Sequence, residues 1–297
     1  MKFALLSTAS VVALAGAIAP AFAADDFTGV VQLDIGRASQ SGSPYVGDPT
    51  IYGGKAKGLW PLSADVHLQA DLFVEKSDGI IDNWGPQLDA DSDLIGGAIH
   101  LLHPFENRAR FGLAGSVWNS DAFVPAGNGL TDVTYGLVAV EGQFFGTDWS
   151  FMAQAGAFTK FDCSGACPGA LEDGVFLRGK VRYFLHDNTV LTLESVRMWG
   201  GRVDDVFGLK NLDSTQWIVE AEHRFKDSEF SVFANLSQQN VDSSTFVFGG
   251  VDATGGMIGV KFYYDQVSLR SNDRDGAELD TPTFGAAPPV AGAISTP

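Results

Sequence analysis

The sequence is poor in basic residues and in long apolar segments, and each shortage excludes a class of protein. Lysine and arginine total 19, against 36 aspartates and glutamates, and the formal net charge is -17. Because nucleic-acid-binding surfaces need clustered basic side chains, we expect no nucleic-acid partner. After residue 23 the sequence has no apolar run of about 18 residues, so no transmembrane helix is predicted. A chain of this kind enters a membrane only as β-strands.

Cysteine is also scarce, with Cys163 and Cys167 as the only two. Four residues apart in an exported chain, they are placed to close a small loop, and we predict a disulfide between them. A metal site is the alternative, but it needs further ligands, and neither a second cysteine pair nor a histidine lies nearby in the sequence. We therefore predict no metal.

The first 23 residues have the parts of a secretory signal peptide. Lys2 supplies a positive charge, residues 4–19 are uncharged and mostly apolar, and the small residues Ala21 and Ala23 form a cleavage site. A membrane anchor is the alternative, but the apolar run is short for the roughly 20 residues that a bilayer requires. We predict residues 1–23 as a signal peptide that is cleaved after Ala23.

Apolar and polar side chains alternate in the rest of the chain, which is the period of a β-strand. The segment 62–75 is the clearest, with Leu68, Leu72 and Val74 on one face and Gln69 and Asp71 on the other. Twelve segments have strand character: 27–37, 50–60, 62–75, 93–102, 108–118, 132–145, 148–160, 174–185, 189–199, 215–225, 229–239 and 255–264.

Connections between these segments alternate between short and long. The short ones are 61–63, 103–107, 146–147, 186–188 and 226–227, and the long ones are 38–49, 76–92, 119–131, 161–173, 200–214 and 240–254. Short turns on one side and long loops on the other are typical of outer-membrane barrels, whose short turns face the periplasm. Three of the short turns predict the pairings Gln143 with Ser150, Lys180 with Glu194, and Arg224 with Glu229.

Aromatic residues gather near both ends of the predicted strands. One set is Phe27, Trp60, Phe144, Trp149, Tyr183, Phe225, Phe230 and Tyr264, and the other is Tyr52, Trp118, Tyr135, Trp199 and Trp217. Two aromatic girdles are what the two faces of a membrane favour. We predict an all-β fold, a closed antiparallel transmembrane β-barrel of about 12 strands; an exported soluble β-sandwich remains the alternative.

The last predicted strand, residues 257–264, places Phe262 and Tyr264 three and five positions after Gly259. In this the chain resembles Gram-negative outer-membrane β-barrel proteins of the porin-like kind, over residues 24–264. It departs from them at Met257, where a polar residue is usual, and in the 33 residues that follow Tyr264. The resemblance implies location in the outer membrane, with membrane lipid, lipopolysaccharide and the barrel-assembly machinery as partners.

Residues 265–297 change in composition, first to serine, asparagine, aspartate and arginine and then to proline, alanine and glycine. This composition predicts a disordered periplasmic tail. A plug in the barrel lumen and a contact with the cell wall are the alternatives.

The polar faces of the strands carry charges that we expect to line the lumen. These residues are Lys55, Lys57, Asp65, His67, Asp71, Arg110, Glu141, Lys160, Arg178, Lys180, Arg182, Glu194, Glu220 and Glu222. Separated strips of opposite charge select among charged solutes, and they equally form an ion-pair network. Twelve strands leave room for a narrow pore, so we predict a porin-like channel for passive diffusion of small hydrophilic solutes, without a cofactor.

Acidic loops favour an alternative, a closed structural or adhesive barrel that displays them. The acids are Asp78, Asp82, Asp89, Asp91 and Asp93 in one loop and Asp204, Asp205 and Asp213 in another. The first loop begins with calcium-loop spacing, but Leu94 and His100 stand where glycine and glutamate are required. No serine with a neighbouring histidine forms a nucleophile site, and we expect no enzymatic activity.

Overall fold

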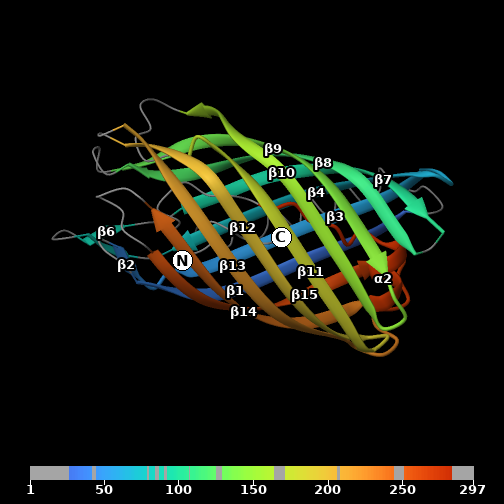
Figure 1. The fold of residues 1–297 in the computed structure, drawn as a ribbon. Helices are drawn as coiled ribbons and strands as arrows, with labels where there is room; N and C mark the ends of the chain where they lie inside the picture. Colours follow the sequence, from blue (N-terminus) through green and yellow to red (C-terminus); the bar gives the residue numbers. More distant parts are fainter. Residues whose placement is uncertain are drawn as a thin grey trace.

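The strands close into a barrel in the computed structural model (Figure 1). The structure describes residues 27–41, 45–78, 80–83, 87–89, 92–106, 108–124, 129–163, 171–205, 208–243 and 251–282. The predicted signal peptide, with Ala23, lies outside these residues, as do Cys167 and residues 283–297.

Twelve strands of 13 to 17 residues form the wall of the barrel. They are β1 (Thr28–Ser41), β3 (Thr50–Ser63), β4 (Val66–Asp78), β7 (Ser92–Phe105), β8 (Ala109–Val124), β9 (Gly129–Phe145), β10 (Trp149–Cys163), β11 (Asp173–His186), β12 (Thr189–Asp205), β13 (Gly208–Arg224), β14 (Phe230–Ser243) and β15 (Val251–Tyr264). Short strands β2 (Tyr45–Gly47), β5 (Ile80–Asn83) and β6 (Gln87–Asp89) extend the sheet at the end with the long loops.

Every neighbouring pair in the wall is antiparallel, and the ring closes where β1 pairs with β15, from Gly29 opposite Tyr264 to Ser41 opposite Asp252. Closure removes the unpaired strand edges that an open sheet exposes. The predicted closed barrel of twelve strands is confirmed, and the soluble sandwich is excluded because the strands form one continuous ring.

The outer face of the wall is apolar. Val138 is 69% exposed and Leu236 is 71% exposed, and the same face carries Ile99, Leu113, Val140, Leu177, Leu193, Val219 and Ile258. Monomeric soluble proteins rarely expose an apolar surface of this extent to water, whereas lipid covers it without cost. The outer face is therefore the lipid-facing belt of the barrel.

Aromatic side chains border this belt at the short-turn end, where Phe144, Trp149, Tyr183, Phe225, Phe230 and Tyr264 are exposed. At the other end Trp199 and Trp217 are exposed, as expected of a girdle. The prediction was wrong for Trp118 and Tyr135, which are buried inside the barrel and stack with ring centroids 5.4 Å apart. Both lie on the inward side of their strands, so they fill space in the lumen.

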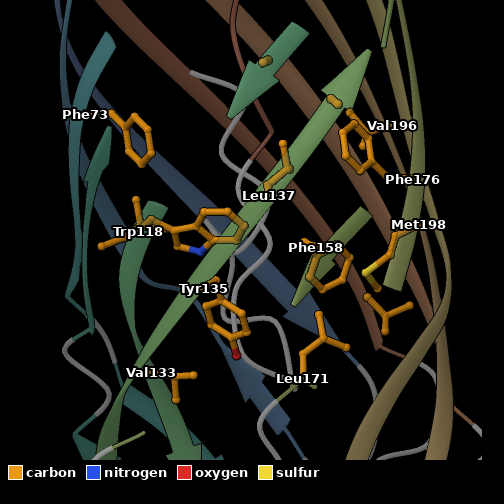
Figure 2. Close-up of a cluster of buried hydrophobic side chains, with 14 residues drawn as sticks. Phe73, Trp118, Val133, Tyr135, Leu137, Phe158, Leu171, Phe176, Val196 and Met198 are labelled. Carbon is orange, nitrogen blue, oxygen red and sulfur yellow. The ribbon is translucent and has the colours of Figure 1, made fainter. Parts of the chain in front are cut away.

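Trp118 and Tyr135 belong to an apolar cluster inside the barrel, toward the long loops (Figure 2). Its members are Phe73, Leu94, Ala114, Trp118, Val133, Tyr135, Leu137, Ala139, Phe158, Leu171, Phe176, Val196, Met198 and Val241. The cluster draws on β4, β7 to β12 and β14, so it fills much of that part of the lumen with side chains.

Strand register agrees with one of the three predicted pairings. Lys180 lies opposite Glu194, but Gln143 lies opposite Met152 and Arg224 lies opposite Ser231. The turn between β9 and β10 and the turn between β13 and β14 are each longer than predicted, so each of these two pairings moves by two residues. A shift of two keeps every side chain on its own face, so the predicted faces hold although the register does not.

The predicted disorder of 265–297 is wrong for the part that the structure describes. After Tyr264 the chain forms α2 (Leu269–Asp275), which Ser268 caps by accepting from the Ser271 N–H. Residues 276–282 then run into the lumen. Figure 1 shows α2 at the short-turn end of the barrel. Within the described residues, no helix is both long and apolar enough to span a membrane.

Lysine substitution tests whether the apolar outer face contacts lipid. A lysine costs about 2–4 kcal/mol at the bilayer midplane and about 0–1 kcal/mol near the interfaces. We expect Val138→Lys, midway along β9, to lower the free energy of unfolding by the larger amount and Leu62→Lys, at the end of β3, by the smaller. Urea unfolding in lipid vesicles measures both, and equally small losses would contradict a lipid-facing belt.

Candidate functional site

The segment from Ser268 to Pro282, called here the tail segment, enters the lumen at the short-turn end. Leu269 is fully buried against Val30, Phe184, Val190 and Tyr263. Arg270 forms ion pairs with Asp148 and Asp187, and Arg274 donates to the Gly146 carbonyl at 2.6 Å. These contacts attach the helix to the periplasmic turns, so its direction into the barrel is fixed.

Asp273 anchors the end of α2 to three strands. Its Oδ1 accepts hydrogen bonds from Ser150 Oγ at 3.0 Å, Gln143 Nε2 at 3.1 Å and Arg182 Nη1 at 2.9 Å. Arg110 donates to the backbone carbonyls of Asp273 and Gly276, at 2.8 and 3.0 Å. Four side chains therefore donate five hydrogen bonds to one helix end.

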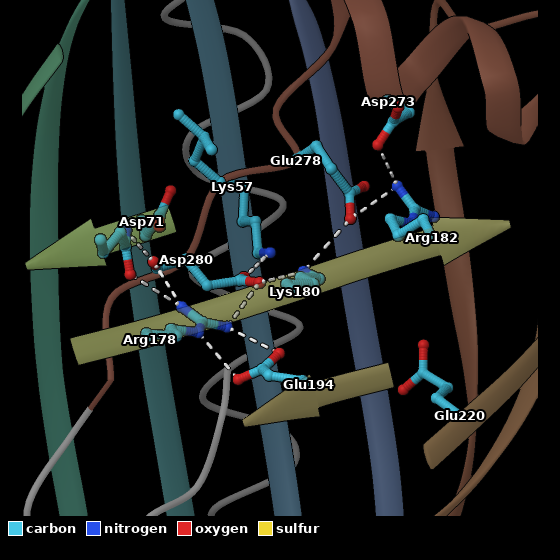
Figure 3. A network of polar contacts seen from close by, with 12 residues as sticks. Lys57, Asp71, Arg178, Lys180, Arg182, Glu194, Glu220, Asp273, Glu278 and Asp280 are labelled. Atoms are coloured by element: carbon cyan, nitrogen blue, oxygen red, sulfur yellow. Dashed lines mark hydrogen bonds and ion pairs between the residues drawn. The ribbon is translucent and has the colours of Figure 1, made fainter. Parts of the chain in front are cut away.

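Deeper in the lumen, Asp280 lies among three cations (Figure 3). Its carboxylate contacts Lys57 Nζ, Lys180 Nζ at 2.9 Å and Arg178 Nη2 at 3.5 Å. Its backbone carbonyl accepts from Arg178 Nη1 at 2.7 Å and from Gln154 Nε2 at 2.6 Å. Asp280 is 2% exposed, so these partners replace the water that a free carboxylate binds.

Glu278 bridges the two anchors. Its Oε1 lies 2.8 Å from Arg182 Nη1 and 3.5 Å from Lys180 Nζ. Burial alone raises the pKa of a carboxyl group, but Arg182, Lys180 and Lys57 outweigh burial and hold the pKa of Glu278 well below its ordinary value of 4.5. Glu278 is therefore ionised in the lumen.

Four cations contact the carboxylates of the tail segment, and we call them the basic cradle: Lys57, Arg178, Lys180 and Arg182. On the barrel wall, Arg178 is paired with Glu194 through two hydrogen bonds of 2.8 and 3.0 Å. The carboxylates that form ion pairs with Lys57, Lys180 and Arg182 all come from the tail segment in the part of the chain that the structure describes. The cradle thus depends on the tail segment for most of its counter-charge.

Apolar contacts complete the fit. Ala277 and Leu279, on either side of Glu278, are buried against Leu59, Leu102 and Met152. Gln69 donates to the Leu279 carbonyl at 2.7 Å. The alternation of apolar and acidic residues along the tail segment matches an apolar and a basic side of the lumen wall.

The fourteen residues predicted to line the lumen occupy different environments. Eight are buried inside the barrel: Lys55, Asp71, Arg110, Glu141, Arg178, Arg182, Glu194 and Glu222. Five are partly exposed: Lys57, His67, Lys160, Lys180 and Glu220. Asp65 is exposed in the turn between β3 and β4, and Lys160 pairs with Glu172 near the long loops, so neither joins the tail-segment contacts.

His100, which is not among the fourteen predicted lining residues, is buried between two of these acids. His100 Nδ1 lies 2.9 Å from Glu141 Oε1, and its Nε2 lies 3.2 Å from Asp71 Oδ2. Gln154 donates to Glu141 and Gln69 donates to Asp71. The alternation of side chains along β7 places His100 on the inward face of the barrel. This alternation is visible in the sequence and indicates that His100 faces the lumen.

On the opposite wall, Lys261 lies between two of the predicted acids, 3.1 Å from Glu220 and 2.8 Å from Glu222. The Tyr263 hydroxyl donates to Glu222 at 2.5 Å. This wall carries one cation against two carboxylates, so it has an excess of acid, in contrast to the basic cradle.

A cavity of about 110 Å³ lies between the two walls. It is lined at one end by Arg37 and Ile51, near the long loops, and at the other by Glu278 and Asp280. Polar side chains along it include Gln32, Asp34, Lys55, Glu194, Gln216, Glu220, Ser237 and Lys261. Apolar side chains such as Ile51, Phe73 and Leu94 also line it, so the cavity has a mixed surface, and the tail segment bounds its periplasmic end.

Cys163 lies outside this site. Cys163 ends β10 and packs against the apolar cluster, while Cys167 lies outside the described residues, so the disulfide stays a prediction. Among the residues that the structure describes, no three histidine, cysteine or acidic side chains are grouped to hold a metal ion.

Two solved structures share this fold over most of the chain. An outer-membrane channel from Pseudomonas putida F1 is 12% identical, with a TM-score of 0.55. The superposition covers 80% of this chain and 95% of the channel. The translocator domain of the autotransporter NalP from Neisseria meningitidis is 11% identical, with a TM-score of 0.52. That superposition covers 87% of this chain and 98% of the translocator domain. No family model and no curated protein matches the sequence.

Identities this low establish a shared fold and leave activity open. The closed ring of antiparallel strands, its apolar outer belt and its polar interior define an outer-membrane β-barrel, and the protein belongs to this class. Its place is the bacterial outer membrane.

Arg182→Met tests whether the basic cradle holds the tail segment. The substitution removes charge-assisted hydrogen bonds to Asp273 and Glu278, each worth about 1.5–3 kcal/mol, so the undocked population rises at least about tenfold. Trypsin should then cleave after Arg270 and Arg274 at least about tenfold faster, as mass spectrometry measures.

Arg224→Met is the matched control, because Arg224 lies inside the same barrel but bonds to Ser228 and packs over Tyr263. We expect its tail segment to resist trypsin as the wild type does. Equal cleavage in both variants would contradict a specific role for Arg182.

Proposed function

We propose that the protein is an outer-membrane channel for small hydrophilic solutes, and that its own tail segment closes it. The observation that carries this proposal is the occupancy of the basic cradle by Asp273, Glu278 and Asp280. A wall that only needed to be filled would use apolar side chains, since burying ion pairs gains little stability over apolar packing.

The cavity beside the tail segment supports a route for solutes. Its lining includes charged and polar side chains from both walls, among them Lys55, Glu194 and Lys261, and it extends from the long-loop end of the lumen to the tail segment. Withdrawal of residues 276–282 would extend this space toward the periplasmic mouth. The predicted lumen residues then divide into a basic side, headed by Arg178 and Lys180, and a side where Glu220 and Glu222 surround Lys261.

A permanently closed barrel with a structural or adhesive role is the second candidate. The apolar cluster around Trp118 favours it, because this cluster occupies part of the lumen that the tail segment does not reach. The two candidates differ in one measurable property, which is conductance after the tail segment has been released.

Lipopolysaccharide and the barrel-assembly machinery stay predicted partners, and the absence of enzymatic activity stays a prediction. The low identity of the solved structures with this fold adds no argument about either.

Neutralising the tail segment tests the channel. In the full-length variant Asp273→Asn, Glu278→Gln and Asp280→Asn, the cradle loses three counter-charges, and we expect the tail segment to leave the lumen. Planar-bilayer recordings should show a conductance several times that of the wild type.

Asp265→Asn with Asp275→Asn is the control, because both carboxylates are exposed and lie outside the cradle. We expect wild-type conductance from this pair. A released tail segment, demonstrated by trypsin, without any conductance would favour the permanently closed barrel instead.

Acid should remove the part of docking that Glu278 provides. Burial raises the pKa of Asp273 in the docked state, so protonation of Asp273 acts in the opposite direction, and the comparison with Glu278→Gln isolates the Glu278 contribution. The pKa of Glu278 is lower when the tail segment is docked, so its contribution to docking is complete above about pH 4.5 and is lost as the pH falls below that value. We expect the open probability in bilayers to rise as the pH is lowered from neutral toward about 3, and to rise less steeply in Glu278→Gln. An identical pH profile in both proteins would contradict the assignment.

A further inference from the structure

We infer that the basic cradle is a binding site for small solutes that carry two or more carboxylate groups, and that the tail segment occupies it as an internal competitor. This inference rests on the proposed channel and names the class of solute that the channel would take.

The first argument is the chemistry of the bound groups. Each of Asp273, Glu278 and Asp280 binds through its carboxylate, whereas Asp275, the other acidic residue of the described tail segment, is exposed. Arginine presents paired donors that match carboxylate oxygens, and lysine adds a compact charge. A wall with these cations recognises carboxylates whether they belong to the chain or to a solute.

The second argument is the spacing of the carboxylates. Lys180 Nζ lies 2.9 Å from Asp280 Oδ2 and 3.5 Å from Glu278 Oε1, so one ammonium group joins both side chains. The two carboxylates therefore lie no farther apart than the sum of these distances. A short, flexible dicarboxylate spans such a separation, whereas a monocarboxylate would leave part of the cradle unpaired.

The third argument is the charge that remains when the tail segment leaves. Among the described residues, Glu194 is the single wall carboxylate that forms an ion pair with the cradle, and it is already bonded to Arg178. Lys57, Lys180 and Arg182 would then face the lumen without these tail-segment partners. The wall acids Asp71, Glu194 and Glu222 attract these cations in part. The like charges still lie close together, which favours binding of an anion in place of the tail segment.

The fourth argument is access. The cavity that reaches Glu278 and Asp280 is also lined by Lys57, Lys180 and Arg182, so a small solute in this cavity contacts the cradle without unfolding the wall. Entry from the long-loop side brings the solute to the point where the tail segment is bound. Competition at that point would couple solute binding to opening.

Glutarate is the probe for this inference, because it has two carboxylates on a short flexible chain. We expect glutarate to accelerate tryptic cleavage after Arg270 and Arg274 in the wild-type protein at least fivefold at saturation. Glutaramide, a neutral molecule of the same shape, and sodium chloride of equal ionic strength should leave the rate unchanged. Equal acceleration by any of these controls would overturn the inference, since it would reduce the effect to crowding or screening.

A lysine variant places the effect in the lumen. Lys180→Gln should cleave faster than the wild type without glutarate and should show no further acceleration with it. Lys76→Gln, which removes a cation paired with Asp93 outside the cradle, should keep the full glutarate response. A glutarate response that survives in Lys180→Gln would contradict the placement of the binding site at the basic cradle.

Direct binding separates this inference from the proposed channel. By titration calorimetry, glutarate should bind the variant with Asp273→Asn, Glu278→Gln and Asp280→Asn at least tenfold more tightly than it binds the wild type, because the competitor is gone. Equal or weaker binding would overturn the carboxylate site even if that variant conducts. If the variant binds glutarate more tightly but does not conduct, the carboxylate-binding site is supported and the proposed channel function is contradicted.

Discussion

The pairing of buried charge inside a closed ring is the constraint on which the rest of the structure depends. A barrel whose outer face meets lipid must direct its polar side chains inward, and twelve strands leave too little room for bulk water around all of them. Arg178, Arg182 and Asp280 are each less than 5% exposed, so protein groups must satisfy them. The tail segment supplies the acids that one side of the wall lacks.

The same constraint explains the division of the lumen into two parts. Toward the long loops, the interior is filled by aromatic and aliphatic side chains around Trp118 and Tyr135, which need no partners. Toward the periplasm, the interior is charged, and a separate piece of chain completes it. A permanently filled lumen gains little from a charged interior over an apolar one. A plug that can leave, by contrast, requires contacts that solvent and other anions can replace.

Much of the fold could be predicted from the sequence, because alternation assigns each side chain to a face without knowledge of its neighbours. Gln143 and Arg224 kept their predicted faces although their partners moved by two residues. Trp118 was misplaced because its position near a strand end was given more weight than its alternation with Ser116 and Ser120, which are buried. The docked tail segment could not be predicted, because its composition indicates disorder and its partners come from strands that only the closed ring brings together.

Hydrogen exchange of residues 269–282 in the full-length protein, held in lipid and followed by mass spectrometry, tests most directly that this segment is bound in the lumen. The account predicts that the peptide exchanges slowly, on the scale of the neighbouring strand β11, because charged side chains hold it and the barrel surrounds it. Exchange as fast as that of an unstructured peptide would contradict the account.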